Sequence, residues 1–471
     1  MRRGELPLWG LPTWCKLNNV IVNGVGAANV EGRGLGLVAE DDLGIDAGST
    51  VLLTVPKDLV LSAEGVEDYA KESREFRQLL DAAGHQSLRG DILLFLLVQL
   101  VLSSPDYKGG LGAGTGWTQY FKFLPTRVPV PTTWSETERS LLRGTSLESA
   151  VSAKLAALTK EFNHLREATE SIPFWDKLLN VDEAITVYDW VELDALYRSR
   201  SLGLPNSGES MVPFLDLANH SSPATAFFEQ NANGEVVLLL HENANVPKKG
   251  EVTIDYGHDK PAAEMLFSYG FIDPDTRARS IILPVESMED DPLAKAKLHV
   301  FESPPTLKIT DEATGSPRWD APFVYLMCLN FEDGLSFKVL QETDGTKQLR
   351  MFWQDSDVTS RAESMESIVK SHELTQIFRL RVITVVLDIV QGQLGALAVD
   401  MDETVINSAE NPEKFRAATY LRGVEKDLLE RALGVIEQEV GQMTMPIMPR
   451  FIEHCYLFPF DYLLTQLSSC L

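Results

Sequence analysis

The chain contains little cysteine. Only four cysteines occur among its 471 residues, and they lie far apart: Cys15, Cys328, Cys455 and Cys470. No two of them have the short spacing of zinc ligands, and four scattered thiols define no disulfide framework. We therefore expect no metal site. A reducing compartment, cytoplasmic or nuclear, is the expected location.

Long apolar runs are also missing. The densest run, residues 92–102, is interrupted by Gln99 and is shorter than the ~20 residues that a membrane span needs. Arg2 and Arg3 stand near the start, but no apolar stretch follows them as it would in a secretory signal. The sequence therefore predicts neither a membrane segment nor export.

Positive charge is scarce as well. The chain has 42 Lys and Arg against 68 Asp and Glu, which gives a formal net charge of −26. Binding of nucleic acid through its phosphates needs a basic face, so this composition argues against direct contact with nucleic acid. An acidic protein attracts a basic protein or peptide over long range. Solubility alone explains the charge about equally well, and both explanations stay open.

Apolar patterning divides the chain into segments. With 44% hydrophobic and 23% charged residues, the composition is that of a soluble globular protein with room for ~two to four domains. Short β-branched runs separated by Gly, Asn and Asp predict a tightly turned sheet without helices over 20–61. Steps of three and four, as in Val151, Leu155 and Leu158, predict helices over 64–187. A helix over 187–199 and further strands follow, the strands at 226–229, 236–241 and 252–254.

The last part of the chain is predicted to be predominantly helical beyond about residue 273. Strong helical periodicity covers 373–397 and 412–438. The second of these helices can begin well, because Asn411 can cap its first turn and Pro412 has the fixed φ that suits the first helical position.

Four short segments combine polar residues, aromatic residues and glycine in a fixed order. They are Gly32-Arg33-Gly34-Leu35-Gly36-Leu37, Met211-Val212-Pro213-Phe214-Leu215-Asp216-Leu217-Ala218-Asn219-His220-Ser221, Ile254-Asp255-Tyr256-Gly257 and Leu266-Phe267-Ser268-Tyr269-Gly270-Phe271. Together they resemble SET-domain methyltransferases, and more narrowly the branch typified by the Rubisco large-subunit lysine methyltransferase. The resemblance covers essentially the whole chain, and residues 420–429 resemble the Tyr-Arg-x-Gly-Glu-Lys signature of the family's substrate-binding domain.

This resemblance implies an α+β fold with a β-rich SET core. In the family, a helical insert interrupts the core (an iSET-like arrangement), a threaded segment forms a pseudoknot, and a mostly α-helical C-terminal substrate-binding domain follows. The expected boundaries are 1–63 and 188–275 for the two parts of the SET core, 64–187 for the insert and 276–471 for the last domain. A monomer is expected.

The resemblance also implies the reaction. The methyl donor would be S-adenosyl-L-methionine, with S-adenosyl-L-homocysteine as product and no metal. Methyl transfer from a sulfonium is an in-line displacement, so the protein must align donor and acceptor and exclude water rather than supply a nucleophile. Oxygens around the methyl favour its developing charge.

Donor-binding residues are expected in three places. In the family, the loop at Arg33, Gly34 and Leu35 presents main-chain groups to the donor, although a tight turn between two strands explains these glycines equally well. Arg200 would hold the donor's carboxylate with its planar fork, against the alternative of an exposed arginine near a helix end. Polar residues after an apolar stretch would bind the donor's other parts: Asp216, Asn219 and His220. A lone histidine is more often a satisfied buried side chain, but the neighbouring motifs favour the donor role.

The acceptor side is expected to be aromatic. Tyr269 and Tyr256 are the predicted catalytic residues: the family's tyrosine at the first position points its hydroxyl at the methyl-transfer centre, and the second flanks donor and acceptor. Phenols pair a flat apolar wall with one hydroxyl, so they suit an aliphatic chain that ends in an amine, although core tyrosines are the commoner case. Leu202, Tyr269 and Phe271 would contact the substrate. An apolar Leu202 suits a lysine stem and gives an imidazole no hydrogen-bond partner, so lysine is favoured over histidine.

One segment departs from the family pattern. Many relatives carry Ser-Asn-Ala-Glu where this chain has Pro261-Ala262-Ala263-Glu264. We expect Pro261 at the first helical position, where it preorganises the helix. The acceptor amine must also lose its proton, and no general base is evident; in the family, solvent in the channel is the expected route.

The sequence leaves three functions open. The favoured one is a protein-lysine N-methyltransferase acting on a non-histone protein, such as a translation factor, a ribosomal protein or cytochrome c by analogy with related enzymes. The second is a catalytically weak SET fold that acts as a binding scaffold, which the altered stretch at 261–263 suggests. The third is a protein-histidine methyltransferase.

Overall fold

The structure is a computed structural model. It describes residues 1–444 apart from 45–49, 108, 110, 113, 258, 277, 289, 312–314, 342–345 and 400–411. The chain forms two compact units, one of residues 1–135 and 150–277, the other of residues 136–149 and 278 onward. Each unit has its own hydrophobic core.

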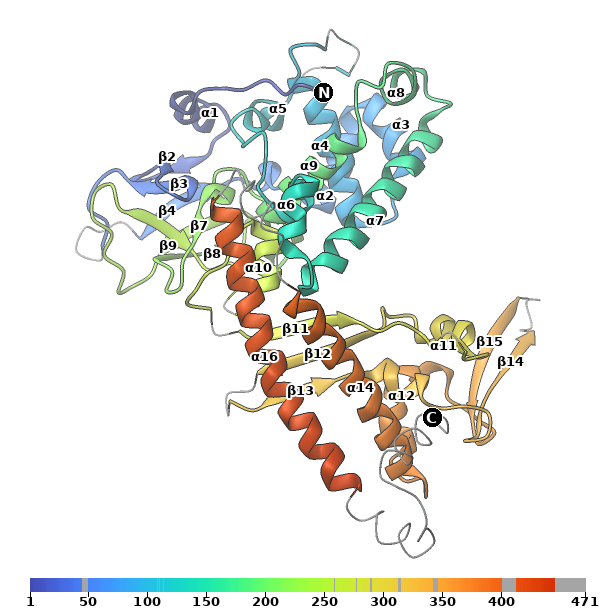
Figure 1. Cartoon of the computed structure of the whole chain (residues 1–471). Helices are drawn as coiled ribbons and strands as arrows, with labels where there is room; N and C mark the ends of the chain where they lie inside the picture. The colour runs from blue at the N-terminus through green and yellow to red at the C-terminus, as the bar shows by residue number, and fades with distance from the viewer. Residues whose placement is uncertain are drawn as a thin grey trace, which may run out of the picture. The chain divides into compact units, whose positions relative to one another are not determined.

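The first unit contains two four-stranded sheets and a hairpin (Figure 1). The first sheet has the strand order β1 (Ile21–Val22), β4 (Val51–Val55), β9 (Val236–Leu240) and β8 (Ala226–Gln230). The second has the order β2 (Val25–Val30), β3 (Gly34–Ala39), β10 (Glu251–Ile254) and β7 (Asn219–His220). The hairpin consists of β5 (Ser201–Leu204) and β6 (Gly208–Met211). Each sheet thus joins strands from before and after the helical segment, and the strands predicted in both places are confirmed.

Helices fill most of residues 63–200, as predicted. They are α2 (Ala63–Glu72), α3 (Arg74–Ala83), α4 (Leu88–Ser103), α5 (Gly116–Phe121), α7 (Ser146–Thr169), α8 (Pro173–Asp176) and α9 (Val187–Arg200). The first three begin in the same way, because each N-cap serine accepts a hydrogen bond from the backbone N–H three residues on. Shorter helical turns were not predicted: α1 (Leu11–Leu17) precedes the sheet, and a 3-10 turn, Lys57–Leu59, lies within the segment expected to lack helices.

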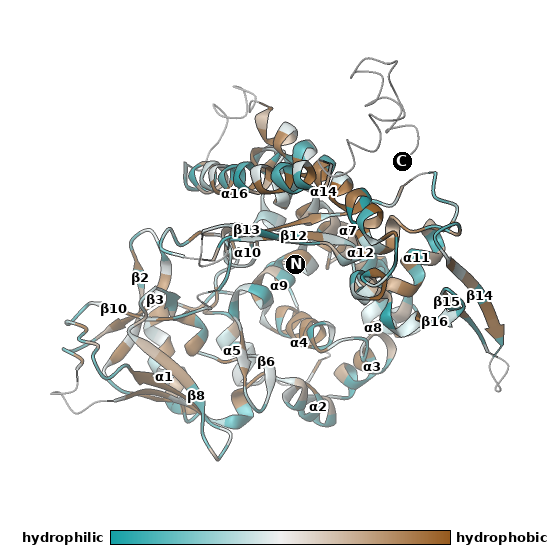
Figure 2. Ribbon diagram, turned by 90° about the horizontal axis from the view of Figure 1, so that it is seen from below, coloured by the Kyte–Doolittle hydropathy of each residue, from teal (hydrophilic) through white to brown (hydrophobic). Residues whose placement is uncertain are grey.

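The apolar run at 92–102 is the centre of this core. Helix α4 contains it and is apolar on all sides, so Figure 2 draws it largely in the hydrophobic colour. Ile92, Leu93, Leu96, Leu97 and Val98 have no exposed surface. A helix that is hydrophobic all round must be covered on every side, and α2, α3, α5 and α9 cover this one. The prediction of a buried helix is confirmed.

The second unit is mainly helical but also contains two three-stranded antiparallel sheets. Its helices include α11 (Ala294–Phe301), α12 (Pro322–Met327), α13 (Met365–Val369), α14 (Thr375–Ala398) and α16 (Pro412–Thr444). The long helices predicted at 373–397 and 412–438 are therefore confirmed. Asn411, the predicted cap, lies outside the described residues.

The two sheets of this unit were not predicted. They are β11 (Ser280–Pro284), β12 (Thr306–Asp311) and β13 (Pro317–Asp320), and β14 (Leu335–Gln341), β15 (Lys347–Trp353) and β16 (Ser356–Asp357). In β11 buried and less buried residues alternate over only five positions. Such a short alternation does not stand out in the sequence beside the long helical patterns that follow.

Helix α14 has the length and composition of a membrane span. Among the described residues it is the one helix that meets this test, with a mean hydropathy of 1.5 over its most apolar window. Only 28% of that window is buried, but Phe378, Val382, Ile383, Val386 and Val390 are buried, and the helix packs on α12 and α16. Packing in a protein core accounts for these residues.

The signature at 420–429 ties a short segment to α16. Glu425 accepts a hydrogen bond from Ser146 N at 2.9 Å and a second one from the Ser146 hydroxyl. Arg422 donates to Leu397 O at 2.8 Å and also to Arg143 O. Within the second unit, these contacts fasten residues 143–146, including the first residue of α7, to α16, and they give the signature a structural role.

Candidate functional site

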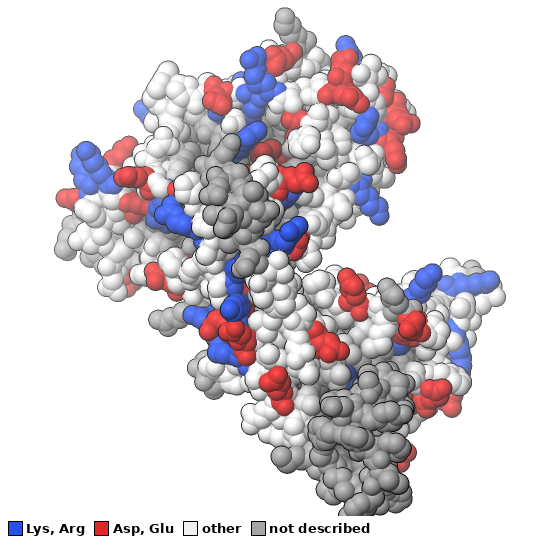
Figure 3. All heavy atoms as spheres, viewed as in Figure 1, with Lys and Arg blue, Asp and Glu red and all other residues white. Residues whose placement is uncertain are grey.

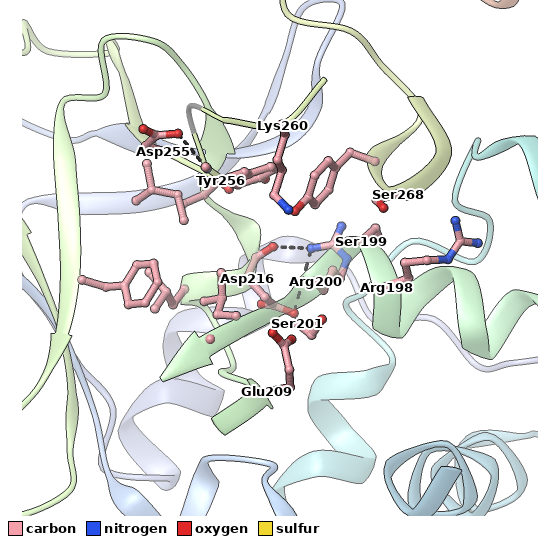
Figure 4. A pocket seen from close by; sticks show the side chains of 18 residues that line it. Arg198, Ser199, Arg200, Ser201, Glu209, Asp216, Asp255, Tyr256, Lys260 and Ser268 are labelled. Carbon is pink, nitrogen blue, oxygen red and sulfur yellow. Dashed lines mark hydrogen bonds and ion pairs between the residues drawn. The ribbon is translucent and has the colours of Figure 1, made fainter. Parts of the chain in front are cut away.

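A cavity of about 390 Å³ lies in the first unit. Its walls come from the end of α9, the β5–β6 hairpin, the 3-10 turn η7 (Leu215–Leu217), and the segment from the end of β10 to α10 (Ala262–Tyr269). Figure 4 shows Arg200 and Asp216 on one side and Lys260 entering from the other. Predicted site residues that line the cavity are Arg200, Leu202, Asp216, Tyr256 and Tyr269.

The β3–β10–β7 ladder brings two further predicted segments together. In β10, Val252 pairs with Leu37 of β3 and Ile254 pairs with His220 of β7. Glu251 links the two segments, because it forms an ion pair with Arg33 at 2.5 Å and accepts from Asn219 Nδ2 at 2.8 Å. Residues far apart in sequence therefore adjoin at this edge of the site.

The loop at 33–36 approaches Asn219 closely. A Cβ atom on Gly36 would lie 2.7 Å from Asn219 Nδ2, so a larger residue at this position would displace the Asn219 side chain. Arg33 also donates a hydrogen bond to His220 O. Gly34 is exposed, and Leu35 is half-buried and packs against the core of the unit. These residues border the cavity's β10 side rather than line the cavity itself.

Arg200 and Asp216 carry unpartnered polar atoms. The Arg200 guanidinium donates to Asp216 O at 2.5 Å, and its Nη1 lies 3.9 Å from Asp216 Oδ2. Arg200 Nε and Asp216 Oδ2 are buried without a hydrogen-bond partner. Buried polar groups normally have partners, so a donor and an acceptor left open on residues that line a cavity suit a polar ligand. With a side chain 13% exposed, Arg200 is not the exposed arginine of the alternative interpretation.

Tyr120 positions this pair, and no sequence motif had indicated it. Its hydroxyl donates to Asp216 Oδ1 and accepts from Phe214 N at 2.8 Å. Phe214 has a φ of +72°, which a bulky residue adopts only under the constraint of its surroundings. Burial raises the pKa of Asp216 to about 6, although Arg200 opposes the shift. The turn that carries Asp216 is thus held in a strained, desolvated conformation.

His220 is bonded at both ring nitrogens. Nδ1 accepts from Tyr256 N at 3.0 Å, and Nε2 lies 3.1 Å from Asp273 Oδ2. The first bond requires an unprotonated Nδ1, so we assign the proton to Nε2, which donates to Asp273. The ring is satisfied within the protein, and any donor contact of this residue must come from its backbone. The donor-binding role of His220 stays a prediction.

Aromatic rings cluster where the sequence predicts the acceptor. The rings of Tyr256 and Tyr269 lie 4.7 Å apart, and Phe271 lies 6.2 Å from Tyr269. Tyr256 donates its hydroxyl to Ala218 O at 2.7 Å, and burial raises its pKa well above the ordinary value. Tyr269 is the last residue of α10, which ends at Gly270 in the left-handed conformation.

The remaining wall is mixed in character. Leu202 pairs with Ser210 across the hairpin, and Phe228 adds a second apolar side chain. Lys260 and Glu209 also line the cavity, and neither was singled out in the sequence. Pro261 is the N-cap of α10, one residue before the first helical position that the sequence predicted, because the helix begins at Ala262.

Metal ligands do not gather in this unit or elsewhere in the described part of the chain. Within those residues no group of three or more His, Cys, Asp and Glu is placed to hold a metal ion.

Known proteins resemble this chain over most of its length. SET domain-containing protein 8 of Schizosaccharomyces pombe is 27% identical over 380 residues, which are 79% of this chain and 83% of that protein. The Rubisco large-subunit N-methyltransferase of Pisum sativum is 29% identical over 289 residues, and the match spans 59% of this chain and about half, 53%, of that protein. The human actin-histidine N-methyltransferase is 20% identical, with 94% of this chain and 75% of that protein covered. No family model matches the chain.

Solved structures show the same fold. The structure of Rubisco LSMT bound to AdoMet superposes with a TM-score of 0.66 at 21% identity and covers 98% of this chain and 100% of that one. The structure of the LSMT SET domain bound to MeLysine and AdoHcy gives a TM-score of 0.65, also at 21% identity. The mixed helix and strand architecture predicted from the sequence is that of these proteins. The chain therefore has the fold of the SET-domain proteins of the Rubisco large-subunit methyltransferase-like type.

Proposed function

We propose that this protein is an S-adenosyl-L-methionine-dependent protein-lysine N-methyltransferase that acts on a non-histone protein. One observation carries the proposal: the unpartnered atoms of Arg200 and Asp216 and the paired rings of Tyr256 and Tyr269 belong to one cavity. Methyl transfer requires that a charged donor be aligned with an aliphatic acceptor. The Arg200–Asp216 pair suits the donor, and the two tyrosine rings suit the acceptor.

The donor side of this cavity fits the methyl donor. Arg200, whose Nε is unpartnered, would hold the donor's carboxylate, and Asp216 Oδ2 would accept a hydrogen bond from another donor group. Backbone groups at Arg33, Gly34 and Leu35 and at Asn219 and His220 would complete the cradle from the β3–β10–β7 edge. When bound, S-adenosyl-L-methionine supplies a sulfonium methyl group, with S-adenosyl-L-homocysteine left after transfer.

The acceptor side fits lysine. Leu202 offers an apolar surface to the aliphatic stem of a lysine. The rings of Tyr256 and Tyr269 would flank that stem. An imidazole would leave a nitrogen without a partner against Leu202, at the cost of an unpaired polar group. The human actin-histidine relative makes histidine the second candidate. Tandem mass spectrometry of the product separates the two acceptors.

The substrate is proposed to be a protein with a basic surface. The net charge of −26 favours encounter with such a partner. On the face drawn in Figure 3, basic side chains are scattered among acidic ones. The relatives' names mention Rubisco and aldolase as substrates. We propose a translation factor, a ribosomal protein or a similar protein of the cytoplasm or nucleus as the substrate of this chain.

Transfer of label tests the activity. The purified chain is incubated with S-adenosyl-L-methionine carrying a tritiated methyl group and a cell extract, and label on protein is counted. Tyr269→Phe keeps the ring but removes the hydroxyl, so we expect an intact fold and a strong loss of transfer. Tyr188→Phe is the matched control, because Tyr188 lies on the same unit with 79% of its surface exposed, away from the cavity.

Three results would each revise the proposal. Absence of label alongside intact donor binding would favour a binding scaffold. Equal transfer by Tyr269→Phe and the wild type would remove Tyr269 from the site. Label on histidine alone would overturn the role given to Leu202.

A further inference from the structure

Lys260 is the cationic side chain that the cavity holds beside Tyr269. It enters the cavity opposite Arg200 and Asp216, and its ammonium points inward (Figure 4). Its Nζ lies 2.5 Å from Glu264 Oε1 and 5.9 Å from the centre of the Tyr269 ring. The side chain is 28% exposed, so solvent screens this charge only in part.

Two hydrogen bonds hold the backbone of Lys260, and its side chain is held by Glu264. Lys260 N donates to Gly257 O at 3.2 Å, and the Thr276 hydroxyl donates to Lys260 O at 3.0 Å. Gly257 has a φ of +122°, and a Cβ there would lie only 3.2 Å from Lys260 Cε. The glycine thus leaves room for the lysine stem over the backbone. The ammonium is held beside the acceptor wall rather than free in solvent.

Charged and titratable groups from several elements surround Lys260 and Tyr269. They are Glu264 on α10, Tyr256 and Asp255 after β10, Glu209 on β6, Arg200 on α9 and Asp216 in η7. Burial raises the pKa of Tyr269, and Lys260 opposes that shift more strongly than any other charged neighbour. Burial alone would lower the pKa of Lys260, but the hydrogen bond to Glu264 and the neighbouring Tyr269 raise it, so the lysine stays charged at neutral pH.

We propose that Lys260 is a positioning residue that keeps the acceptor amine unprotonated beside Tyr269. This inference rests on the proposed function. A lysine acceptor enters as an ammonium and must lose its proton to water before its nitrogen lone pair can form a bond to the methyl carbon. As that bond forms, the sulfur–carbon bond breaks and its electrons stay on sulfur.

A fixed cation beside Tyr269 makes a second positive charge at the acceptor nitrogen costly. Lys260 therefore favours the neutral amine without accepting the proton itself. Because Lys260 favours the neutral amine, transfer can proceed although no general base is evident among the described residues of the cavity. Glu264 holds the ammonium in place and offsets part of its field.

The pH dependence of transfer tests this role. Label transfer to one batch of cell extract is measured as a single-turnover rate, with enzyme in excess. The pH dependence of this rate reports the protonation of the acceptor amine in the bound complex. Removal of the cation by Lys260→Met is expected to move the midpoint of the profile by about one pH unit toward alkaline pH, which is about tenfold in rate below the midpoint. The plateau at high pH stays near that of the wild type.

Three further variants separate charge from structure. Lys260→Arg keeps the cation and should restore most of the wild-type profile. Glu264→Gln removes the offsetting charge and should move the midpoint the other way. Lys71→Met is the matched control, because Lys71 is ion-paired with Asp68 on the surface of the same unit and should leave the profile unchanged.

A second measurement does not need turnover. Tyrosinate absorbance is followed against pH in the wild type and in Lys260→Met, each with the signal of its own Tyr269→Phe version subtracted. The phenol of Tyr269 should ionise at higher pH once the cation is gone.

Identical Tyr269 titrations in the two backgrounds would overturn the inference whether or not the protein transfers methyl groups. Identical pH–rate profiles of Lys260→Met and the wild type would do the same, as would methylation of Lys260 itself, which would make it an acceptor. A shifted phenol titration in a chain that transfers no label would instead contradict the proposed function alone.

Discussion

Glu425 makes the stability of the second unit depend on pH. Its side chain is buried, with 3% of the residue exposed, and both carboxylate oxygens face Ser146. Burial raises its pKa from 4.5 to about 7, although the bonds from Ser146 oppose the shift. The replacement to test is Glu425→Gln, because the amide can accept from Ser146 N and donate to the Ser146 hydroxyl.

The sign of the effect follows from the direction of the shift. Below pH 4.5 the carboxyl group is protonated in both the folded and the unfolded chain. Its full contribution to the free energy of unfolding is present there. Between that pH and about 7 the unfolded chain releases the proton while the folded one retains it, so folding loses stability as pH rises. The difference of two to three pKa units corresponds to about 3 kcal/mol. Glutamine does not ionise, so the variant should lack this slope.

Hydrogen exchange of the backbone amides of α16 measures the effect locally. A whole-chain melt is less suitable because two units need not unfold together. After correction for intrinsic exchange rates, Glu425→Gln should gain about 2 to 3 kcal/mol of protection over the wild type between acidic pH and pH 8. Glu430→Gln is the control on the same helix, because Glu430 is 58% exposed and pairs with Lys426.

Parallel protection profiles of wild type and Glu425→Gln across this range would refute the reasoning. Such a result would mean that Glu425 has the same pKa in the folded chain as in the unfolded chain. Glu425→Ala should instead be destabilised at every pH, by about 1 to 3 kcal/mol, because Ser146 N loses its partner.

Two further replacements test how buried polar contacts of Tyr120 and Asp194 contribute to stability, measured by urea unfolding. Tyr120→Phe leaves Phe214 N without its partner and should cost about 1 to 3 kcal/mol and weaken donor binding, so wild-type stability would contradict the role of that hydroxyl. Asp194→Asn should cost about 3 to 5 kcal/mol, because the Asp194 side chain has no exposed surface and faces three cations. These cations are Arg89, Lys154 and Arg198. Glu161→Gln should cost less, since Glu161 is 39% exposed, and equal losses would contradict the argument.

Periodicity allowed the sequence to predict the helices and strands with the strongest patterns. The apolar run in α4 and the helical repeats of α14 and α16 are long, so local pattern decides their structure. The strands of residues 280–357 were missed because their alternation is weak against that background: β14 has seven residues but buries only Leu335. Pro261 shows the usual uncertainty of a helix boundary, since it precedes α10 by one residue.

The candidate site was predictable where a motif carries it. Arg200, Leu202, Asp216, Tyr256 and Tyr269 all line one cavity. Residues that act through a single long-range contact give no such signal. Tyr120 reaches Asp216 from 96 positions away, Glu251 links Arg33 to Asn219, and Asp273 bonds His220 from a loop. Only the folded chain shows these partners.

The central claim is that the cavity transfers a methyl group to a lysine side chain. The most direct measurement uses S-adenosyl-L-methionine with a deuterated methyl group, followed by tandem mass spectrometry of the acceptor proteins after incubation with wild-type chain or Tyr269→Phe. We expect deuterated methyl groups on lysine nitrogen with the wild type and a strong decrease with the variant. Acceptor proteins that stay unlabelled while the chain binds the donor, or label confined to another residue type, would contradict it.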